Sequence, residues 1–324
     1  MAIPSVKPRD TPFLEAVQVE PVTNSKSQFT ADIPRDWCGT PAAHGGYLQA
    51  LIFSTARAYF LTHHPARNQP DPISAHVQFL KQVWPGPVRL SVKPVNIGSR
   101  VSVIQIELSQ SVSHSVSQNS KSHSQATDYI TGVIAIVTQS NLATESGLSL
   151  PTVPTIPKSE IPDREKDCVD FIEDPFIKAA APTSLKADIK VLPGGIDRTG
   201  SDHRGRSFRE LWLKFADGTN WDVLSLGWLS DAFGGAPNNY APDNIDYKLG
   251  IVYPTLSMVT EIKKDPRDAK WLFMRMRTHE IRNGRFDTEV TIVDEMGDLV
   301  CMSRHVSLIL TRKTPEELKK IYKL

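Results

Sequence analysis

The sequence predicts an α+β protein built from two tandem lobes, each with a curved antiparallel sheet wrapped around a central helix. Each half of the chain contains one long apolar segment with helical spacing, followed by four segments typical of strands. The order of these elements is the same in both halves, which indicates an internal duplication. A helix that is apolar on nearly every side has to be buried, and the strands that follow it supply the sheet that buries it.

The first half opens with a weakly alternating segment, residues 13–35, which predicts a strand. Gly45 and Gly46 then lead into an apolar segment, Tyr47–Leu61, which predicts the buried helix. Turn residues separate the segments that follow. The predicted strands are Ile73–Trp84, Val88–Ile97, Val101–Leu108 and Tyr129–Thr138.

The second half repeats this order. A strand is predicted at Phe208–Phe215 and a helix at Asn220–Phe233. Asn283-Gly284 predicts a tight turn, and Thr314 with Glu317 forms a capping box that predicts a short final helix. The remaining predicted strands are Leu256–Lys263, Lys270–Ile281, Arg285–Asp294 and Leu299–Thr311.

The domain boundaries follow from proline content. Residues 1–140 are expected to form the N-terminal lobe and residues 183–324 the C-terminal lobe, which is expected to carry the site. Residues 141–182 are rich in proline and predict a linker, with a short helical piece at Asp167–Ile172. Residues 109–127 predict a polar hairpin extension, and residues 234–254 predict a lid or a binding loop.

Composition excludes several classes of partner. Hydrophobic residues make up 40% of the chain, charged residues 23%, and the formal net charge is +1, so neither nucleic acid nor an anionic membrane is an expected partner. The three cysteines (Cys38, Cys168 and Cys301) lie far apart and form no disulfide framework or metal-binding pair, which predicts reduced thiols in an intracellular protein.

Targeting signals are also missing. The first nine residues lack the pattern of a signal peptide, and no apolar run approaches the roughly 20 residues of a membrane helix. The final residues, Tyr322-Lys323-Leu324, match the Ser-Lys-Leu peroxisomal address poorly. We therefore expect a cytoplasmic protein. GxSxG, HExxH and GxGxxG motifs are absent, and no metal or organic cofactor is expected.

Short motifs distributed over both halves resemble those of the double hot-dog acyl-CoA thioesterases, the bacterial thioesterase II group and its fungal relatives. Each motif is weak alone, but their order and spacing together are fairly specific, and they span most of the chain outside the linker and the polar loop. The motifs are His44-Gly45-Gly46-Tyr47, residues 74–80, Pro85-Gly86, Gly98-Ser99-Arg100, Ser109-Gln110, residues 229–233, Pro254-Thr255-Leu256, Asn283-Gly284-Arg285 and residues 294–300.

The resemblance implies a catalytic site in the second half. The family uses an aspartate on the second-half helix, a serine or threonine about two dozen residues later, and a glutamine on the last strand. Asp231 and Thr255 match the first two positions, whereas the third is His305. Glutamine only orients a water molecule, but histidine can also accept its proton, so the site either retains hydrolysis or transfers protons on a carbon skeleton.

The residue types support this interpretation and leave structural alternatives. A carboxylate in an apolar helix is costly unless it is hydrogen-bonded or functional, so Asp231 is either catalytic or bonded to a neighbouring turn. Thr255 at a strand start could orient the same water. His305 is either a general base or a histidine satisfied within its strand.

Substrate contacts are expected at five further positions. The backbone at His44, Gly45 and Gly46 precedes the first helix, whose N-terminal amides could bind the thioester oxygen, although these residues could equally just turn the chain into the helix. His76 and Trp228 are also predicted to bind substrate.

Three functions remain open. The chain could hydrolyse an acyl thioester, act as a dehydratase, isomerase or cyclase on a polyketide-like intermediate of secondary metabolism, or bind an acyl group without catalysis. In each case the partner is a small molecule. Sheet edges exposed in such lobes also leave room for a homo-oligomer.

Overall fold

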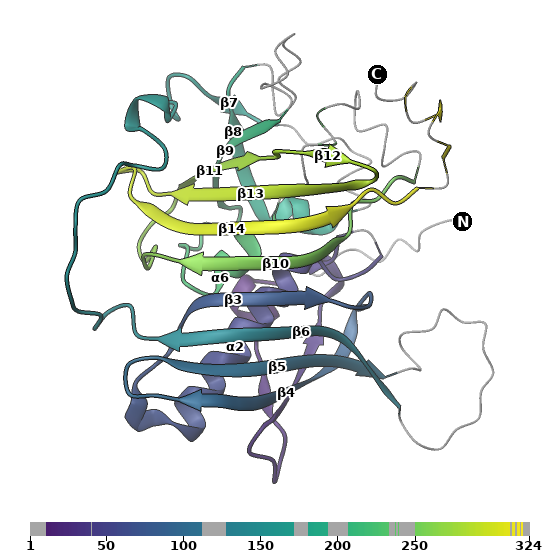
Figure 1. Cartoon of the computed structure of the whole chain (residues 1–324), viewed down its shortest axis with the longest axis vertical. Helices are drawn as coiled ribbons and strands as arrows, with labels where there is room; N and C mark the ends of the chain where they lie inside the picture. The colour runs from purple at the N-terminus through teal and green to yellow at the C-terminus, as the bar shows by residue number, and fades with distance from the viewer. Residues whose placement is uncertain are drawn as a thin grey trace.

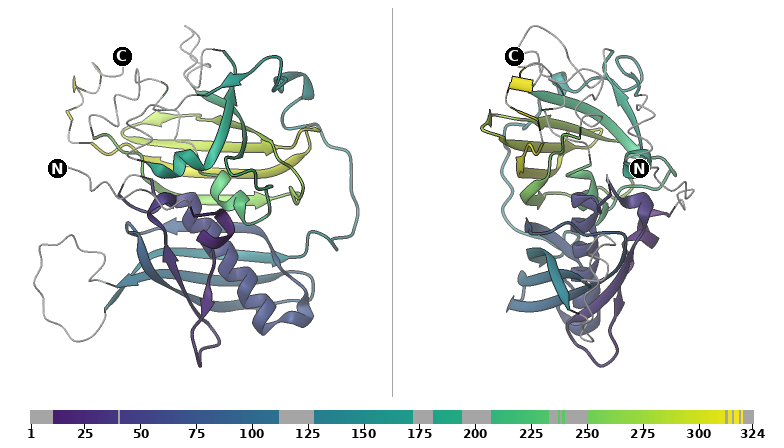
Figure 2. Two further views of the ribbon diagram at one scale, coloured as in Figure 1. Left: turned by 180° about the vertical axis from the view of Figure 1, so that it is seen from behind. Right: turned by 90° about the vertical axis from the view of Figure 1, so that its right-hand side faces the viewer.

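The fold is one continuous antiparallel sheet whose two central helices lie on one of its faces (Figure 1, Figure 2). This arrangement confirms the predicted α+β class with two tandem lobes. In the edge-on view of Figure 2, the helices lie on one side of the sheet. The computed structural model describes residues 11–39, 41–111, 128–171, 181–193, 207–232, 237, 239, 250–311, 313, 314, 316, 317 and 319.

The strand order is the same in both lobes when each is read inward from its outer edge. The first lobe runs β2-β4-β5-β6-β3, the second runs β9-β11-β13-β14-β10, and β3 pairs with β10 at the centre. The two lobes are therefore related by a pseudo-twofold axis between β3 and β10. The strands of the first lobe are β1 (Glu20–Pro21), β2 (Gln28–Ile33), β3 (Asp71–Phe79), β4 (Gly86–Ile97), β5 (Ser102–Ser111) and β6 (Tyr129–Ser140).

The second lobe adds two outer strands to this plan. Strands β8 and β7 lie beyond β9 at the outer edge of the sheet, and both come before β9 in the chain. Strand β12 pairs only with β13. The strands are β7 (Val169–Asp170), β8 (Ala187–Val191), β9 (Phe208–Phe215), β10 (Thr255–Ile262), β11 (Leu272–Arg277), β12 (Ile281–Arg282), β13 (Arg285–Val293) and β14 (Leu299–Leu308). Short 3-10 helices cover Arg35–Trp37, Pro65–Arg67, Lys158–Glu160 and Pro182–Lys186.

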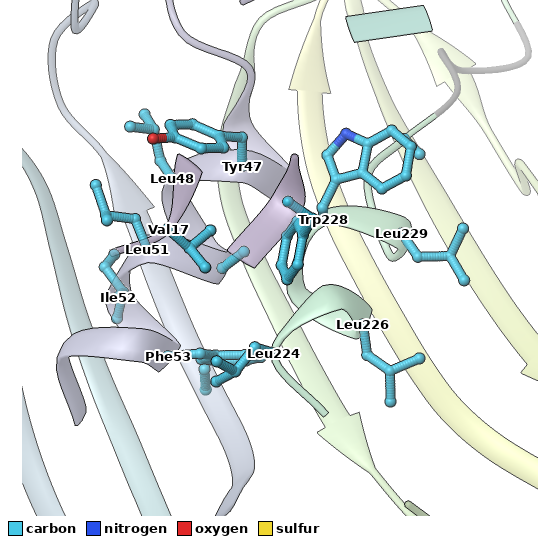
Figure 3. Close-up of a cluster of buried hydrophobic side chains, with 14 of the residues drawn as sticks. Val17, Tyr47, Leu48, Leu51, Ile52, Phe53, Leu224, Leu226, Trp228 and Leu229 are labelled. Carbon is cyan, nitrogen blue, oxygen red and sulfur yellow. The ribbon is translucent and has the colours of Figure 1, made fainter. Parts of the chain in front are cut away.

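The central helices of the two lobes pack against each other over the middle of the sheet. Helix α2 (Gly45–His63) confirms the first predicted helix, and it crosses α6 (Ser225–Leu229) where a Cβ on Gly227 would lie 2.9 Å from the backbone of Ala50. Only glycine allows the two backbones to approach this closely. Figure 3 shows side chains of both helices in one buried cluster: Tyr47, Leu48, Leu51, Ile52, Phe53, Leu224, Leu226, Trp228 and Leu229.

The second helix is much shorter than the predicted Asn220–Phe233. Asp222 and Ser225 exchange hydrogen bonds, with the Ser225 N–H donating to Asp222 Oδ1 at 2.7 Å and the Asp222 N–H to Ser225 Oγ at 2.8 Å. These local bonds hold the chain in a turn before the helix begins. The whole segment is apolar because the turn is buried as well as the helix.

Two other predictions for the chain outside the repeated core are wrong. Residues 13–35 contain a short helix, α1 (Phe13–Ala16), and two short strands instead of one long strand, because Phe13 packs into the core against Trp37. The helical piece predicted at Asp167–Ile172 contains β7, which pairs with β8. Strand β8 itself was not predicted.

Part of the proline-rich segment covers the outer face of the second lobe. Ile156 is buried against Trp212, Phe273 and Val293, and the Trp212 Nε1–H donates to the Pro162 carbonyl at 2.9 Å. The segment is thus fixed on the face of the sheet opposite the helices.

Local turn predictions are confirmed at two places. Asn283 and Gly284 both have positive φ, 52° and 72°, as the expected tight turn requires. The Thr314 N–H donates to Glu317 Oε2 and the Glu317 N–H to Thr314 Oγ1, which completes the capping box. No helix among the described residues has the length and apolar character needed to cross a membrane.

Candidate active site

The Asp231 carboxylate lies where the two lobes meet, just after α6 and beside the first turn of α2. Its Oδ2 accepts a hydrogen bond of 2.7 Å from the Gly46 N–H, and its Oδ1 lies 3.3 Å from His305 Nδ1 on β14. The N-terminal end of α2 carries partial positive charge, which favours a carboxylate at this position. Residues from both halves of the chain therefore hold one acidic group.

His305 is held at both ring nitrogens. Its Nδ1 faces Asp231, and its Nε2 lies 2.6 Å from the hydroxyl oxygen of Ser303 on the same strand. Residues two apart on a strand share a face, so Ser303 and His305 both point toward the helices. The His305 side chain is only 4% exposed, so neither nitrogen is directed to open solvent.

His44 is the second histidine at the carboxylate. It caps α2, accepting the Gly46 N–H at Nδ1 over 3.2 Å, and this nitrogen lies 3.8 Å from Asp231 Oδ2. The Gly46 N–H is thus shared between an imidazole nitrogen and a carboxylate oxygen. The side chains of His44 and Asp231 are 17% and 15% exposed, so neither is fully enclosed.

Charge and burial set the protonation of these groups. Burial alone raises the pKa of Asp231. The opposing effects are larger, so the pKa lies below the ordinary 3.8; they come from the His305 hydrogen bond, the electrostatic influence of His44 and His305, and the Gly46 N–H. Burial lowers the pKa of His44 from 6.5, and this effect exceeds the opposing influence of Asp231. At neutral pH the site therefore contains a carboxylate beside a neutral His44.

The N-terminal amides of α2 do not all have the predicted role. Gly46 was a candidate donor to the thioester oxygen, but its N–H is bonded to Asp231 and His44, and the His44 N–H donates to the Trp37 carbonyl at 3.5 Å. Among the described contacts, no partner is recorded for the Gly45 N–H. Gly45 is therefore the remaining candidate for an oxyanion donor from this helix.

Gly45 also forms one wall of the space beside Asp231. A Cβ at this position would lie 2.7 Å from Asp231 Oδ2 and 3.3 Å from Phe79 Cζ. The absence of a side chain at Gly45 is what leaves room for the carboxylate.

Thr255 lies beside a second serine of β14, Ser307. It is the first residue of β10 and pairs with Ser307 on β14, and the two hydroxyl oxygens are 3.3 Å apart. Ser307 is two residues beyond His305 on the same buried face. Thr255 is thus about 7 Å along the strand from the His305 row, and no contact between Thr255 and Asp231 is recorded among the described residues.

Two predicted substrate-binding residues lie apart from this group. His76 is exposed on β3 and pairs with Val259 and Ile136, on the face of the sheet that points away from the helices. Trp228 is fully buried, and its Nε1–H donates to Thr183 Oγ1 at 3.1 Å (Figure 3). Among the described contacts, the side chains of His76 and Trp228 make none with Asp231, and their role in substrate binding stays a prediction.

The sequence reading missed several polar residues that support the site. Gln49 on α2 is fully buried, and its Nε2 donates to Ser230 Oγ and Thr260 Oγ1 at 3.1 and 3.0 Å. This bridge ties both helices to β10, next to Asp231. A glutamine inside an apolar helix, and a serine two residues before His305 on one strand face, were the signals that could have revealed Gln49 and Ser303.

The first lobe has no matching chemistry. The pseudo-twofold axis exchanges the Gly46–Asp231 contact with the Gly227–Ala50 contact. Ala50 of the first lobe therefore has the position that Asp231 has in the second. The inward face of β6 carries Val133, Ala135 and Val137, whereas that of β14 carries Ser303, His305 and Ser307. The polar strand residues near Asp231 therefore belong to the second lobe, whereas His44 and Gly46 reach the carboxylate from the first.

Other expected features lie partly or wholly outside the described residues. The loop at 234–254, predicted to be a lid or binding loop, is described only at residues 237, 239 and 250–254, and the hairpin extension only at residues 109–111. Within the described part of the chain, no group of three or more His, Cys, Asp or Glu side chains is arranged to hold a metal ion.

Comparison with protein families gives two matches along the chain. Residues 33–127 match the acyl-CoA thioesterase N-terminal domain, and residues 162–309 match the acyl-CoA thioesterase C-terminal domain. Together the two matches include most of the chain. They also include the residues described around the carboxylate, namely His44, Gly46, Asp231, Ser303 and His305.

Similar proteins agree with this result. The thioesterase-like protein TwmA of Talaromyces wortmannii shares 23% identity over 92% of both chains, and the ustilagic acid biosynthesis cluster protein orf2 of Mycosarcoma maydis shares 24% over 82% of this chain and 74% of its own. A protein of unknown function with a hot-dog fold from Alicyclobacillus acidocaldarius superimposes with a TM-score of 0.65 at 15% identity, covering 94% of this chain and 98% of its own.

Proposed function

We propose, because this chain belongs to the double hot-dog acyl-CoA thioesterase family, that it hydrolyses an acyl thioester at the junction of its two lobes. Asp231 would accept a proton from the attacking water. The observation that carries the proposal is the placement of this carboxylate, which is partly accessible and is held by Gly46 of the first lobe and His305 of the second.

The geometry supports a balanced hydrolysis. Water attacks the thioester carbonyl carbon as Asp231 takes its proton, forming a C–O bond. The C–S bond then breaks, and the proton passes from Asp231 to the departing thiolate, whose ordinary pKa of about 8.5 makes it the stronger base. A low pKa makes Asp231 a weak base but keeps it ionised at neutral pH.

His305 can replace the family's glutamine in this scheme. A glutamine amide in this place could donate an N–H to the carboxylate as well as orient water, and His305 Nδ1 is positioned to make the same donation. Because its other nitrogen is engaged by Ser303, we assign His305 to orienting Asp231 rather than to activating water itself.

The test is thiol release from a panel of acyl-CoAs. The wild-type protein should release free thiol from at least one acyl-CoA, and Asp231→Asn should lower the rate by about 10²- to 10⁴-fold because the base is lost. Asp287→Asn is a matched control, since Asp287 also accepts from a histidine, at 2.7 Å, but lies on the outer face of the sheet. An Asp231→Asn variant with wild-type turnover would contradict the proposal.

A second candidate function is proton transfer on the carbon skeleton, as in a dehydratase or isomerase. It is favoured by the neutral His44 next to Asp231, because two groups that exchange protons can serve opposite ends of a carbon framework. Incubation in deuterated water separates the two functions. Deuterium entering the acyl carbon chain without thiol release would favour this candidate.

The substrate is proposed to come from secondary metabolism. The name of one relative, the ustilagic acid biosynthesis cluster protein orf2, supports this proposal. If an acyl-CoA binds but neither thiol release nor deuterium uptake occurs, the third function, acyl binding without catalysis, is favoured.

A further inference from the structure

We propose that Ser303 is a positioning residue of this site, which holds His305 in the single neutral tautomer that donates to Asp231. The proposal rests on the proposed function for its kinetic consequence. The juxtaposition that carries it is a serine hydroxyl, an imidazole and a carboxylate in one row, with distances of 2.6 Å and 3.3 Å between successive polar atoms.

Hydrogen-bonding capacity dictates the arrangement of protons. An ionised carboxylate can only accept, so the His305 nitrogen facing Asp231 has to carry a hydrogen. In the neutral ring the other nitrogen then has a lone pair and accepts the Ser303 hydroxyl hydrogen. The Asp231 carboxylate thus fixes the hydrogen on Nδ1, and the Ser303 hydroxyl stabilises the same tautomer by donating to Nε2.

The surroundings leave Ser303 as the recorded partner of His305 Nε2. His305 pairs with Met258 on β10 and with Thr288 on β13, and neither side chain titrates. The titratable groups near its ring are Asp231 and His44, both on the helix side. Ser303 is 2% exposed, so water would have to enter a closed space to replace its hydroxyl.

Loss of the hydroxyl has a specific consequence. Without it, the Nε2 lone pair is buried and has no hydrogen-bond donor, which is unfavourable in free energy. The ring can relieve this cost by moving its hydrogen to Nε2 or by rotating, and either change removes the donor from Asp231. Ser303 therefore acts on the carboxylate through His305.

The first experiment measures the tautomer directly. Nitrogen-15 NMR of histidine side chains distinguishes a protonated ring nitrogen from one with a free lone pair, and the His305→Gln spectrum identifies the His305 signals. The wild-type protein should show the hydrogen on Nδ1 of neutral His305. Ser303→Ala should show a mixture of tautomers, whereas Ser303→Thr, which keeps the hydroxyl, should restore the wild-type signal.

The second experiment measures turnover. Ser303→Ala should lower kcat by about tenfold and leave KM within about twofold, since it disturbs Asp231 and not substrate contacts. In the His305→Gln background, the same substitution should change kcat by less than about twofold, because glutamine has no tautomer to select.

Ser102→Ala is the matched control. Ser102 is also fully buried on a strand and donates its hydroxyl over 2.6 Å, to Gln69 Oε1, but it lies in the first lobe. It should match Ser303→Ala in its loss of stability and leave kcat per folded molecule unchanged.

The outcomes separate this proposal from the proposed function. If no acyl-CoA is hydrolysed, the function fails, and the NMR measurement still decides the role of Ser303. The positioning role is overturned if Ser303→Ala keeps the hydrogen on Nδ1. It is also overturned if wild-type turnover exists and Ser303→Ala lowers kcat no more than Ser102→Ala does.

Discussion

The position of the Asp231 carboxylate depends on Gly45, because this residue has no Cβ. Gly45 leaves the space that the carboxylate occupies, since a Cβ there would lie 2.7 Å from Asp231 Oδ2. The carboxyl end of a side chain can move aside, but any movement changes its distance to His305. A substitution at Gly45 should therefore affect activity more than stability.

Gly45→Ala should accordingly lower kcat by about 10- to 100-fold, because displacement of a reacting group by about 1 Å has an effect of this size. Thiol release by the purified variant is the measurement. Gly39→Ala is the control, since its Cβ would meet only His44 Cδ2 at 3.9 Å. Wild-type kcat in Gly45→Ala would show that the space beside Asp231 is not used.

His44 makes stability depend on pH. Because its pKa is lowered from 6.5, mainly by burial, the unfolded chain binds more protons than the folded protein between the folded pKa and 6.5. The free energy of unfolding should thus fall as pH drops below 6.5. The lowered pKa of Asp231 acts at lower pH, where its stabilisation is lost as pH falls below 3.8.

Urea unfolding at pH 8, 6 and 5 measures this dependence. His44→Asn keeps an acceptor for the Gly46 N–H but does not titrate, so its stability should change less with pH than that of the wild-type protein. If the free energy of unfolding changed with pH to the same extent in both proteins, His44 would not be held neutral.

At the residue scale, motifs marked two positions that the structure brings together. Asp231 and His305 were found by spacing within the resemblance, and the structure places their side chains together. Ser303 and Gln49 belong to no motif, and serine or glutamine in a buried element is ambiguous without the partner it faces. His76 fitted a motif, but the phase of its strand turns it to the outer face.

At the scale of elements, the close crossing of α2 and α6 determines where Asp231 lies. Gly227 meets the backbone of Ala50, and Gly46 meets the backbone carbonyl of Trp228, so neither contact can be relieved by a side-chain movement. The crossing brings the first turn of α2 to the carboxylate.

Gly227→Ala should therefore destabilise the protein by about 1–3 kcal/mol, the usual cost of overpacking. Chemical denaturation measures the free energy of unfolding, with Gly39→Ala as the comparison for the intrinsic effect of alanine. A variant as stable as Gly39→Ala would mean that the helices are not in close contact at Gly227.

Strands were easier to predict than helices in this chain. The bounds of β9 and β13 agree with the prediction to within one residue, and buried positions alternate with less buried ones over the first part of each strand. The segment at 220–233 is apolar throughout, so its periodicity could not distinguish a long helix from a buried turn followed by a short one. Strand β8 is only five residues long and was missed between prolines and glycines.

At the scale of the whole molecule, a buried ion pair adds to the continuous sheet in joining the lobes. Lys186 Nζ lies 2.7 Å from Asp36 Oδ2, and Asp36 also accepts the Thr11 N–H at 2.7 Å. Asp36 belongs to the first lobe and Lys186 directly precedes β8 of the second. Thr11 is bonded to both members of this ion pair.

Lys186→Met should cost about 3–5 kcal/mol, because it leaves the Asp36 charge buried and without its cation. Asp36→Asn in the same molecule should recover part of this loss, since asparagine still accepts the Thr11 N–H. Fluorescence-monitored denaturation should show one transition for both lobes. Two separate transitions in the wild-type protein would contradict the joint folding of the lobes.

The duplication could be predicted from the repeated order of elements, and so could the burial of one helix in each lobe. The join between β3 and β10 could not, because pairing between distant edges leaves no local pattern in the sequence. It is this join, together with the helix crossing, that brings Gly46 and Asp231 into contact.

The most direct test is the fate of oxygen during turnover. An acyl-CoA that is a substrate should be incubated with the protein in ¹⁸O-labelled water and the acyl product analysed by mass spectrometry. Hydrolysis at Asp231 predicts a free carboxylic acid with one heavy oxygen atom, formed by the wild-type protein and not by Asp231→Asn. A product that keeps its thioester, or a labelled acid formed equally by both proteins, would contradict water activation at this carboxylate.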